Sequence, residues 1–361
     1  MHSPFPYDRL STLEEFFGRE EELEKLSNIV KYSNNLLIHS KRRMGKSSLI
    51  NYFFEQHKED YLCIYVDIFD ITSKEHFAHS LLKAFSNSHK SDIKTAIKNL
   101  TALFKRVRIE PSIDPVTLEY SIKPIVATLS FEDMMDDFFD SIATLSKSKQ
   151  IVLAIDEFQQ IANITDVKLD ALLRKYIQSR ENISYIFLGS KRHMLTSLFE
   201  YKAPLYELAT HYELQPLKVD AIYEYAKKFL DLDVGMVAYI YEKSDGETKM
   251  VQNILHLLYI NREKKVSKEL IDEAINEILN SKDSSYKIIF DTLGNNQKIA
   301  LKIVGKYKRG FFAASILNEY NIKKQTLQSA IDALFKKEFI DKEGDKYFIP
   351  DRSLELWVEN L

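Results

Sequence analysis

One stretch of thirteen residues constrains this chain more than any other. It reads "LLIHSKRRMGKSS", residues 36–48, and it contains the Gly45-Lys46-Ser47 that ends the phosphate-binding pattern G-x-x-x-x-G-K-[ST]. An apolar run precedes the loop and a helical pattern follows it, so backbone N–H groups and a helix dipole would favour an anion there. Ser40 stands where the pattern has its first glycine, which costs the turn some freedom but removes no donor. We therefore predict a strand, a phosphate-binding loop and a helix, rather than a chance helix start.

Apolar runs of strand length recur through the first part of the chain. They cover residues 35–40, 61–68, 150–157 and 183–190, and they are nearly continuous rather than alternating. Such runs are typical of parallel strands that are covered on both faces. Helical patterns lie between them, which predicts an α/β fold with a doubly wound parallel sheet that binds ligands beyond the carboxyl ends of its strands. The prolines and alternating apolar residues of 107–125 predict a small hairpin inserted into this core.

Two further domains are expected after a P-loop core at residues 1–213. The patterns from 214 to 282 are helical, as in the helical lid that follows many such cores. From 283 to 361, three helical patterns precede a two-stranded ribbon that turns at Glu343-Gly344-Asp345. This is the order of elements in a winged helix-turn-helix.

Composition excludes several other classes of protein. The net charge of −3 excludes a molecule that binds nucleic acid through its overall charge. The single cysteine, Cys63, excludes an internal disulfide and fits a small core residue, and His76 and His79 lack the further ligands of a metal cluster. No run reaches the ~18 apolar residues of a membrane span, and the first residues lack the pattern of a secretory leader. We therefore expect a cytosolic protein with no membrane partner.

A pair of carboxylates gives the second chemical signal. "IVLAIDEFQQI" places Asp156 and Glu157 at the end of a buried strand, where adjacent carboxylates are costly unless a cation or solvent meets them. Together with the loop upstream, this Walker B arrangement predicts a site for ATP or ADP with Mg²⁺, in which Lys46 contacts the β- and γ-phosphates. Ser47 and Asp156 would hold the metal, and Glu157 would polarise the attacking water. The alternative is that both carboxylates only cap the following helix.

A third polar residue, Ser190, closes the strand "YIFLGS". P-loop ATPases of the AAA+ kind keep a polar side chain at such a place, between Walker B and the γ-phosphate, and we predict the same role for Ser190. It would equally serve as the N-cap of the next helix. Lys191 and Arg192 follow, either as phosphate sensors or as solvated charges.

Several segments, taken in order, resemble one family of proteins. They are "FFGREEELEKL", "SKRRMGKSSLI", "YVDIF", "LAIDEFQQI", "FLGSKRHML" and "FIPDRSLELWV". Together they resemble the archaeal-type ATPase family, a P-loop group related to the origin-recognition ATPases of the AAA+ class and to the STAND signalling NTPases. The resemblance covers nearly the whole chain and implies an ATPase core, a helical lid and a winged helix.

The resemblance also implies where the nucleotide lies. Phe17, Gly18 and Arg19 would be near the adenine, although a helix entry and core packing would also explain them. The expected nucleotide-binding residues are Phe17, Gly18, Arg19, Ser40, Lys41, Arg42, Arg43, Met44, Gly45, Lys46, Ser47, Ser48 and Gly246.

This chain departs from the family pattern beyond Ser40. It reads "PLYELAT" where relatives often carry an arginine, and Gly246-Glu247-Thr248 where they often show G-x-P. Because an arginine near the γ-phosphate accelerates hydrolysis strongly, its absence predicts slow turnover unless a neighbouring copy supplies one, such as Arg180 or Arg192.

We predict an ATP-controlled switch that binds double-stranded DNA through its winged helix. Residues 284–361 carry 13 Lys and Arg against 10 Asp and Glu, an excess of +3, whereas the rest of the chain has −6. The candidate DNA contacts begin the recognition helix and lie in the wing, where they can reach base edges or phosphates: Lys323, Lys324, Gln325, Thr326, Gln328, Lys342 and Lys346. One alternative is a STAND-type signalling or defence switch that self-associates or binds a protein partner, without DNA. Another is a degenerate nucleotide-binding scaffold.

Overall fold

The computed structural model describes residues 3–88, 99–113, 120–126, 129–190, 192–261 and 265–361. The chain forms two compact units. We call residues 12–41 with 45–215 the sheet unit, and residues 1–11 and 42–44 with 216–361 the C-terminal unit. The second unit includes three residues from the predicted phosphate-binding loop.

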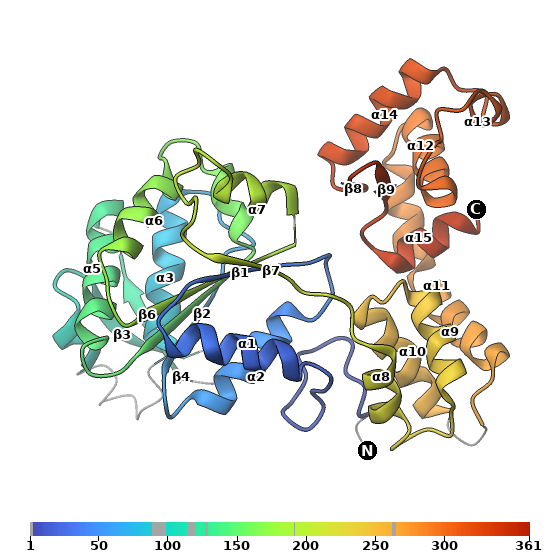
Figure 1. Ribbon diagram of the computed structural model, residues 1–361. Coiled ribbons are helices and arrows are strands. Elements are labelled where there is room, and N and C mark those ends of the chain that lie inside the picture. The colour runs from blue at the N-terminus through green and yellow to red at the C-terminus, as the bar shows by residue number, and fades with distance from the viewer. Residues whose placement is uncertain (1–2, 89–98, 114–119, 127–128, 191, 262–264) are drawn as a thin grey trace. The chain divides into compact units, whose positions relative to one another are not determined.

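Parallel strands form the centre of the sheet unit (Figure 1). They are β1 (Leu36–His39), β2 (Leu62–Asp67), β5 (Ile151–Asp156), β6 (Ile183–Gly189) and β7 (Thr210–Glu213). Their order across the sheet is β2-β5-β6-β1-β7, and each neighbouring pair is parallel. Because parallel strands end at one common edge, the segments after β1, β5 and β6 meet there.

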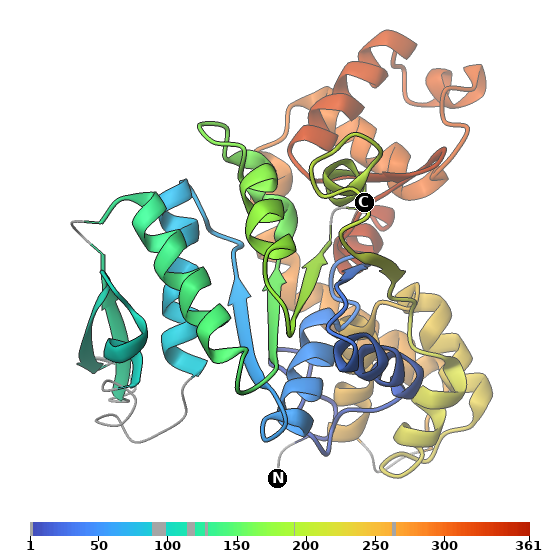
Figure 2. The ribbon, with the colours of Figure 1, turned by 60° about the vertical axis from the view of Figure 1, so that its left-hand side comes forward.

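Helices cover both faces of this sheet. They are α1 (Glu20–Lys31), α2 (Lys46–His57), α3 (Lys74–Ser88), α5 (Phe131–Leu145), α6 (Leu169–Gln178), α7 (Arg192–Phe199) and a short 3₁₀ helix, η1 (Phe158–Asn163). Successive residues of β5 enter two different cores: Val152 packs with α1 and α2, whereas Leu153 packs with α3 and α5. Figure 2 shows blue α1 and α2 on one side of the sheet and α3 and α5 on the other. The predicted doubly wound sheet is therefore confirmed, and its covered faces explain why the strands read as continuous apolar runs.

The sequence patterns did not predict one strand of the sheet, whereas they did predict the inserted hairpin. The missed strand is β7, whose four residues include exposed Thr210 and His211, so it has no continuous apolar run. It lies at the sheet edge, paired with β1. The hairpin expected within 107–125 is confirmed as antiparallel β3 (Arg108–Ile113) and β4 (Tyr120–Ile125).

In its described residues, the C-terminal unit is helical apart from one ribbon. Its helices are α8 (Val219–Ala226), α9 (Val234–Ser244), α10 (Thr248–Ile260), α11 (Lys268–Asp291), α12 (Asn295–Tyr307), α13 (Ala314–Glu319), α14 (Lys324–Lys336) and α15 (Arg352–Glu359). Within the described ranges, no helix combines the length and the apolar character that crossing a membrane requires. The cytosolic location stays a prediction.

The winged helix-turn-helix is confirmed at the end of the chain. Helices α12, α13 and α14 precede a ribbon of β8 (Asp341–Glu343) and β9 (Lys346–Phe348). The ribbon turns at Gly344, whose φ of +62° is the left-handed conformation that glycine adopts at little cost. On its inner face, α14 buries Leu327, Ile331 and Leu334.

The three domain limits given above stay a prediction. Helix α11 runs without interruption through the expected limit at 282/283, since no glycine or proline breaks the chain there. The compact C-terminal unit contains both the expected lid and the expected winged helix.

Candidate active site

The phosphate-binding loop lies between β1 and α2, as its sequence predicted. Gly45 is the N-cap of α2 with a φ of +91°, and Lys46 is the first helical residue. The N–H groups of the first turn of an α-helix have no partner within the helix, and the helix dipole is positive at this end. The loop therefore offers donors and a positive potential to an anion.

Ser40 fits the loop without the freedom of a glycine. The left-handed backbone angles of this loop fall at Arg43, with a φ of +65°, and at Gly45. Ser40 is buried, and its hydroxyl oxygen accepts a hydrogen bond from Lys46 Nζ at 3.1 Å. The same ammonium donates to the carbonyl oxygens of Ser40 at 3.4 Å and Lys41 at 3.2 Å. The replacement thus supplies an acceptor that holds the lysine in the mouth of the loop.

The end of β5 brings the first carboxylate to the loop. Ser47 Oγ donates to Asp156 Oδ2 at 2.7 Å, so residues 109 positions apart in the chain form one polar centre. A hydroxyl and a carboxylate are hard oxygen donors of the kind that Mg²⁺ prefers, together with substrate phosphates. Ser47 and Asp156 therefore fit the predicted metal, whose charge would screen the phosphates of a bound nucleotide.

A tyrosine on the neighbouring strand contacts the same carboxylate. Tyr65 on β2 donates its hydroxyl to Asp156 Oδ2 at 2.5 Å. Burial raises the pKa of Tyr65 above its usual range, and the nearby Asp156 raises it further, so the hydroxyl keeps its proton. Asp67, at the end of β2, lies in register with Asp156.

The second carboxylate, Glu157, is held in a strained conformation. Its φ is +55°, in the left-handed region, where a residue other than glycine costs on the order of 1 kcal/mol or more. Ser190 Oγ donates to Glu157 Oε2 at 3.2 Å, and Gln159 Nε2 donates to the same oxygen. Gln159 is fully buried, and a Cβ at position 189 would lie 2.2 Å from its Oε1, so Gly189 leaves space for this amide. Strain supported by its surroundings is typical of functional sites.

The structure thus brings together five predicted residues, at the carboxyl edge of β1, β5 and β6: Lys46, Ser47, Asp156, Glu157 and Ser190. Their assignment to catalysis, metal binding and nucleotide binding stays a prediction. Ser48 follows in the first turn of α2.

The candidate adenine residues lie at the entry of α1. Gly18 has a φ of +67°, and Arg19 is the N-cap of α1. The Arg19 side chain is buried, where it donates to Glu22 Oε1 and to the carbonyl oxygen of Gln215, both at 2.7 Å. These contacts fix the entry of α1 to the segment after β7. Base recognition by Phe17, Gly18 and Arg19 stays a prediction.

Residues Arg42, Arg43 and Met44 make their contacts within the C-terminal unit. Arg43 forms an ion pair with Asp351 at 2.7 Å and lies 3.8 Å from Glu247. Arg42 pairs with Glu338 at 3.1 Å, with both side chains partly exposed.

Backbone oxygens of the same segment are also engaged. The N–H of Lys249 donates to the Arg43 carbonyl, and the Thr248 hydroxyl donates to the Met44 carbonyl, each at 3.2 Å. Gly246 turns the chain between α9 and α10 with a φ of +68°, and a Cβ there would lie 2.8 Å from Pro216. The contribution of Gly246 to nucleotide binding stays a prediction.

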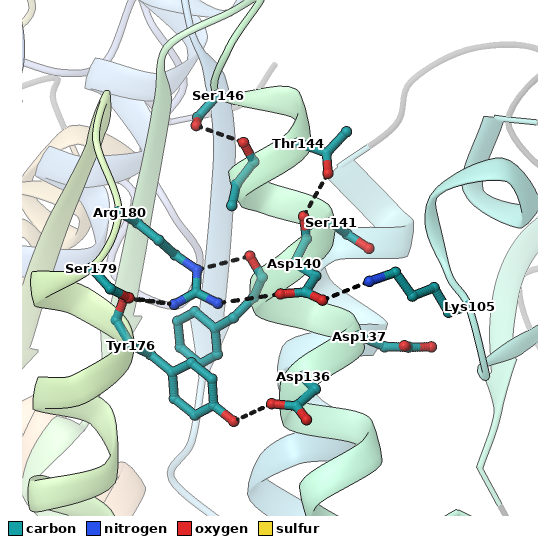
Figure 3. A network of polar contacts seen from close by, with 12 residues as sticks. Lys105, Asp136, Asp137, Asp140, Ser141, Thr144, Ser146, Tyr176, Ser179 and Arg180 are labelled. Carbon is teal, nitrogen blue, oxygen red and sulfur yellow. Dashed lines mark hydrogen bonds and ion pairs between the residues drawn. The ribbon is translucent and has the colours of Figure 1, made fainter.

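Arg180, one of the arginines proposed to act on a neighbouring copy, is engaged in contacts within its own unit. Arg180 precedes β6, at the edge of the sheet opposite the loop, and donates to the carbonyl oxygens of Phe139 at 3.0 Å and Tyr176 at 2.9 Å. It also pairs with Asp140 at 3.5 Å (Figure 3). Arg180 would have to leave this network to reach a nucleotide on another copy. Lys191 and the side chain of Arg192 lie outside the described residues.

The candidate DNA residues mostly lie on the surface of the winged helix. Lys323, Lys324, Gln325 and Gln328 are exposed at the start of α14, and half-buried Thr326 lies beside the start of α12. In the ribbon, Lys342 is exposed and Lys346 is half-buried. Gln328 Nε2 donates to Asp332 Oδ1 at 2.9 Å, which places a carboxylate on the same exposed face.

Two side chains of the site escaped sequence reasoning. Tyr65 lies two residues before the end of its strand, and Gln159 follows the carboxylate pair inside "DEFQQI". Both lie in segments that carry the family resemblance, "YVDIF" and "LAIDEFQQI", but the resemblance assigned no role to either side chain. The other signal was the polar group of each side chain in an otherwise apolar segment, and such a group does not indicate which residue it contacts.

Known protein families match segments of this chain. Residues 16–254 match the family described as ATPase domain predominantly from Archaea, and residues 284–360 match a probable winged helix domain. An uncharacterized ATP-binding protein of Pyrococcus abyssi (strain GE5 / Orsay) is 29% identical over 167 residues, which are 44% of this chain and 46% of that protein. The chain thus spans about half the length of this curated relative.

Two solved structures share the fold. The Walker-type ATPase of Pyrococcus abyssi superposes with a TM-score of 0.64 at 19% identity, covering 99% of both chains. The ORC1 protein of Aeropyrum pernix, in complex with DNA, has a TM-score of 0.51 at 13% identity, covering 96% of this chain and 93% of that one. At these identities the likeness establishes the fold alone. Since the first family match covers well over half of the sequence, this chain belongs to the family of ATPase domains found predominantly in Archaea.

Proposed function

We propose that this protein is a Mg²⁺-dependent ATPase that acts as a nucleotide-controlled switch coupled to double-stranded DNA through its winged helix. The observation that carries the proposal is the hydrogen bond from Ser47 to Asp156, which joins the phosphate loop to the Walker B strand. In this assignment, Lys46 neutralises the β- and γ-phosphates, while Ser47 and Asp156 hold the metal. ADP is the product that would remain at the site.

Glu157 is the residue that we assign to the attacking water. Its carboxylate lies beside Ser190 at the carboxyl edge of the sheet, and Gln159 restrains it from the buried side. A carboxylate held in this way can orient a water molecule or accept its proton.

The switch is supported by the division of the loop between two units. Residues 42–44 belong by their contacts to the C-terminal unit, whereas Lys41 and Gly45 on either side belong to the sheet unit. A nucleotide that reorders this loop would therefore strain or relax the Arg43–Asp351 ion pair. In nucleotide switches, the γ-phosphate and its Mg²⁺ hold loops that relax after hydrolysis.

DNA binding is supported by the winged helix and by its exposed Lys323 and Lys324 at the start of α14. The ORC1 protein that shares the fold was solved in complex with DNA. The second candidate is a STAND-type switch without DNA. It is favoured by the same Arg43–Asp351 pair, because a change in this ion pair would transmit the nucleotide state without any nucleic acid.

The experiment measures ATP turnover and molecular mass with Mg²⁺-ATP, with and without duplex DNA at two salt concentrations. It compares the wild type with Lys46→Ala and Glu157→Gln, and with Lys58→Ala, which removes a lysine at the far end of α2. We expect Lys46→Ala to abolish turnover, and Glu157→Gln to lower it by about 10²–10⁴-fold while nucleotide still binds. Lys58→Ala should behave as wild type.

The outcomes separate the candidate functions. Turnover that rises with DNA at low salt supports the DNA-coupled ATPase, since phosphate contacts weaken as salt increases. If DNA changes neither turnover nor mass, and ATP drives self-association, the STAND-type switch is the correct assignment. Nucleotide binding without turnover in the wild type would leave only a scaffold.

A further inference from the structure

The Asp156 carboxylate is held by three donors. Its Oδ2 accepts from Ser47 Oγ at 2.7 Å and from the Tyr65 hydroxyl at 2.5 Å, and its Oδ1 accepts from the backbone N–H of Glu157 at 2.8 Å. The last of these is local to the strand end. We propose that Tyr65 is a positioning residue, which fixes the orientation of Asp156 for Mg²⁺; this inference rests on the proposed function.

The register of the sheet explains why a tyrosine stands here. Strand β2 runs parallel to β5, with Tyr65 beside Ala154 and Asp67 beside Asp156. Tyr65 therefore starts two residues short of the carboxylate, and its side chain has to extend along the strand to reach it. A phenol has this length, and it packs against the core below α2. Phenylalanine would keep the packing and lose only the donor.

The two side-chain donors act on one oxygen from different directions. Ser47 approaches from the first turn of α2, and Tyr65 approaches from the edge strand of the sheet. The terminal torsion of an aspartate is broad, so the carboxylate would sample more than one orientation if its partners were the Glu157 N–H on Oδ1 and a single donor on Oδ2. Two fixed donors on Oδ2 restrict it to one. Because a serine oxygen can meet a cation while its proton still points at Asp156, the arrangement is compatible with a bound metal.

Groups that hydrogen-bond to metal ligands affect metal affinity strongly. Their loss typically costs about 10-fold to 100-fold in affinity or activity. By contrast, a tyrosine that merely satisfies its hydroxyl would affect stability alone. The measurement must therefore separate metal dependence from folding.

The chain supplies a matched control for this purpose. Tyr176 donates its hydroxyl to Asp136 Oδ1 at 2.7 Å, in the same unit and also partly buried (Figure 3). This pair joins α6 to α5, and neither helix contributes a residue to the phosphate loop. Tyr176→Phe thus removes the same type of hydrogen bond as Tyr65→Phe, without touching Asp156.

The experiment uses the full chain and a fluorescent ATP analogue. Its affinity is measured across a Mg²⁺ titration and again in EDTA, for the wild type, Tyr65→Phe and Tyr176→Phe, with thermal unfolding of each. We expect Tyr65→Phe to raise the half-saturating Mg²⁺ concentration by about 10-fold and to leave the affinity in EDTA unchanged. Tyr176→Phe should change neither.

Two results would overturn the inference. One is a Tyr65→Phe variant with the Mg²⁺ dependence of the wild type, and the other is an equal change in both variants. If the nucleotide affinity of the wild type does not depend on Mg²⁺, the proposed function itself is contradicted. That result is distinct from a failure of the Tyr65 inference.

Discussion

At the residue scale, the departure at Ser40 is resolved by its contacts. The hydroxyl accepts a hydrogen bond from Lys46, and the left-handed angles of the loop are taken by Arg43 and Gly45. A glycine at position 40 would offer no such acceptor. The substitution therefore changes how the lysine is held, while the donors of the loop remain.

Gly189 is the residue at which a single methyl group should disturb the site. In Gly189→Ala the new Cβ would lie 2.2 Å from Gln159 Oε1 and 2.5 Å from Leu195 Cδ1. Overpacking of this kind costs about 1–3 kcal/mol, and it would displace Gln159 from Glu157. We expect a lower free energy of unfolding and slower ATP turnover. The free energy is measured by urea unfolding with circular dichroism as the signal.

The control is Gly305→Ala in α12. There the nearest atoms, in Val358 and Ile349, lie at 3.5 and 3.7 Å, which is ordinary contact. Because alanine is favoured over glycine inside a helix by about 0.5–1 kcal/mol, this variant should be more stable than wild type. A Gly189→Ala protein as stable as wild type would show that Gln159 has room to move.

At the scale of elements, α14 is the helix on which the DNA proposal depends. Its inner face is buried, while Lys323 and Lys324 are exposed where the helix begins. Lys336 and Lys337 are exposed where it ends. The two ends of one helix thus carry the same charge, which allows position to be tested separately from charge.

We expect Lys323→Ala with Lys324→Ala to weaken DNA binding, because these lysines would no longer neutralise phosphates of the duplex. Each phosphate that a lysine ceases to neutralise reduces the slope of log affinity against log salt by about 0.9. The paired control, Lys336→Ala with Lys337→Ala, should keep the wild-type slope, measured by fluorescence anisotropy with duplex DNA. Equally weakened binding in both pairs would mean that net charge, rather than the start of α14, determines the affinity.

At the scale of the whole molecule, Glu247 links pH to stability. It is 6% exposed, and burial raises its pKa to about 7, although Arg43 and the backbone N–H of Arg352 act in the opposite direction. The folded protein therefore holds a proton on Glu247 that the unfolded chain, with an ordinary pKa of 4.5, has released. This contribution to stability is complete below pH 4.5 and is lost as the pH rises through about 7.

Glu247→Gln should remove this pH dependence. Between pH 4.5 and 7 the wild type should lose on the order of 3 kcal/mol relative to the variant, from the shift in pKa. Urea unfolding is followed by the fluorescence of Trp357, the single tryptophan, which lies in the C-terminal unit. Glu242→Gln removes the same charge from an exposed position on α9 and should follow the wild-type profile. A Glu247→Gln profile parallel to that of wild type would contradict the assignment.

Much of the fold could be predicted from the sequence, because the relevant patterns are contiguous. Continuous apolar runs predicted four strands of the sheet, and the glycine of the wing predicted its turn. Strand β7 escaped because half of its residues are exposed. In the site, the motif residues Lys46, Ser47 and Asp156 could be named because their spacing follows from the phosphate chemistry.

The sequence by itself therefore determined the fold class, the family and the loop, since local periodicity and short motifs specify them. Only the tertiary structure decided that Tyr65 contacts Asp156, that Gln159 contacts Glu157, and that Arg43 contacts Asp351. These partners are set by strand register and helix packing between distant segments. A sequence pattern tells which face of an element is buried, but it does not tell which neighbour that face will meet.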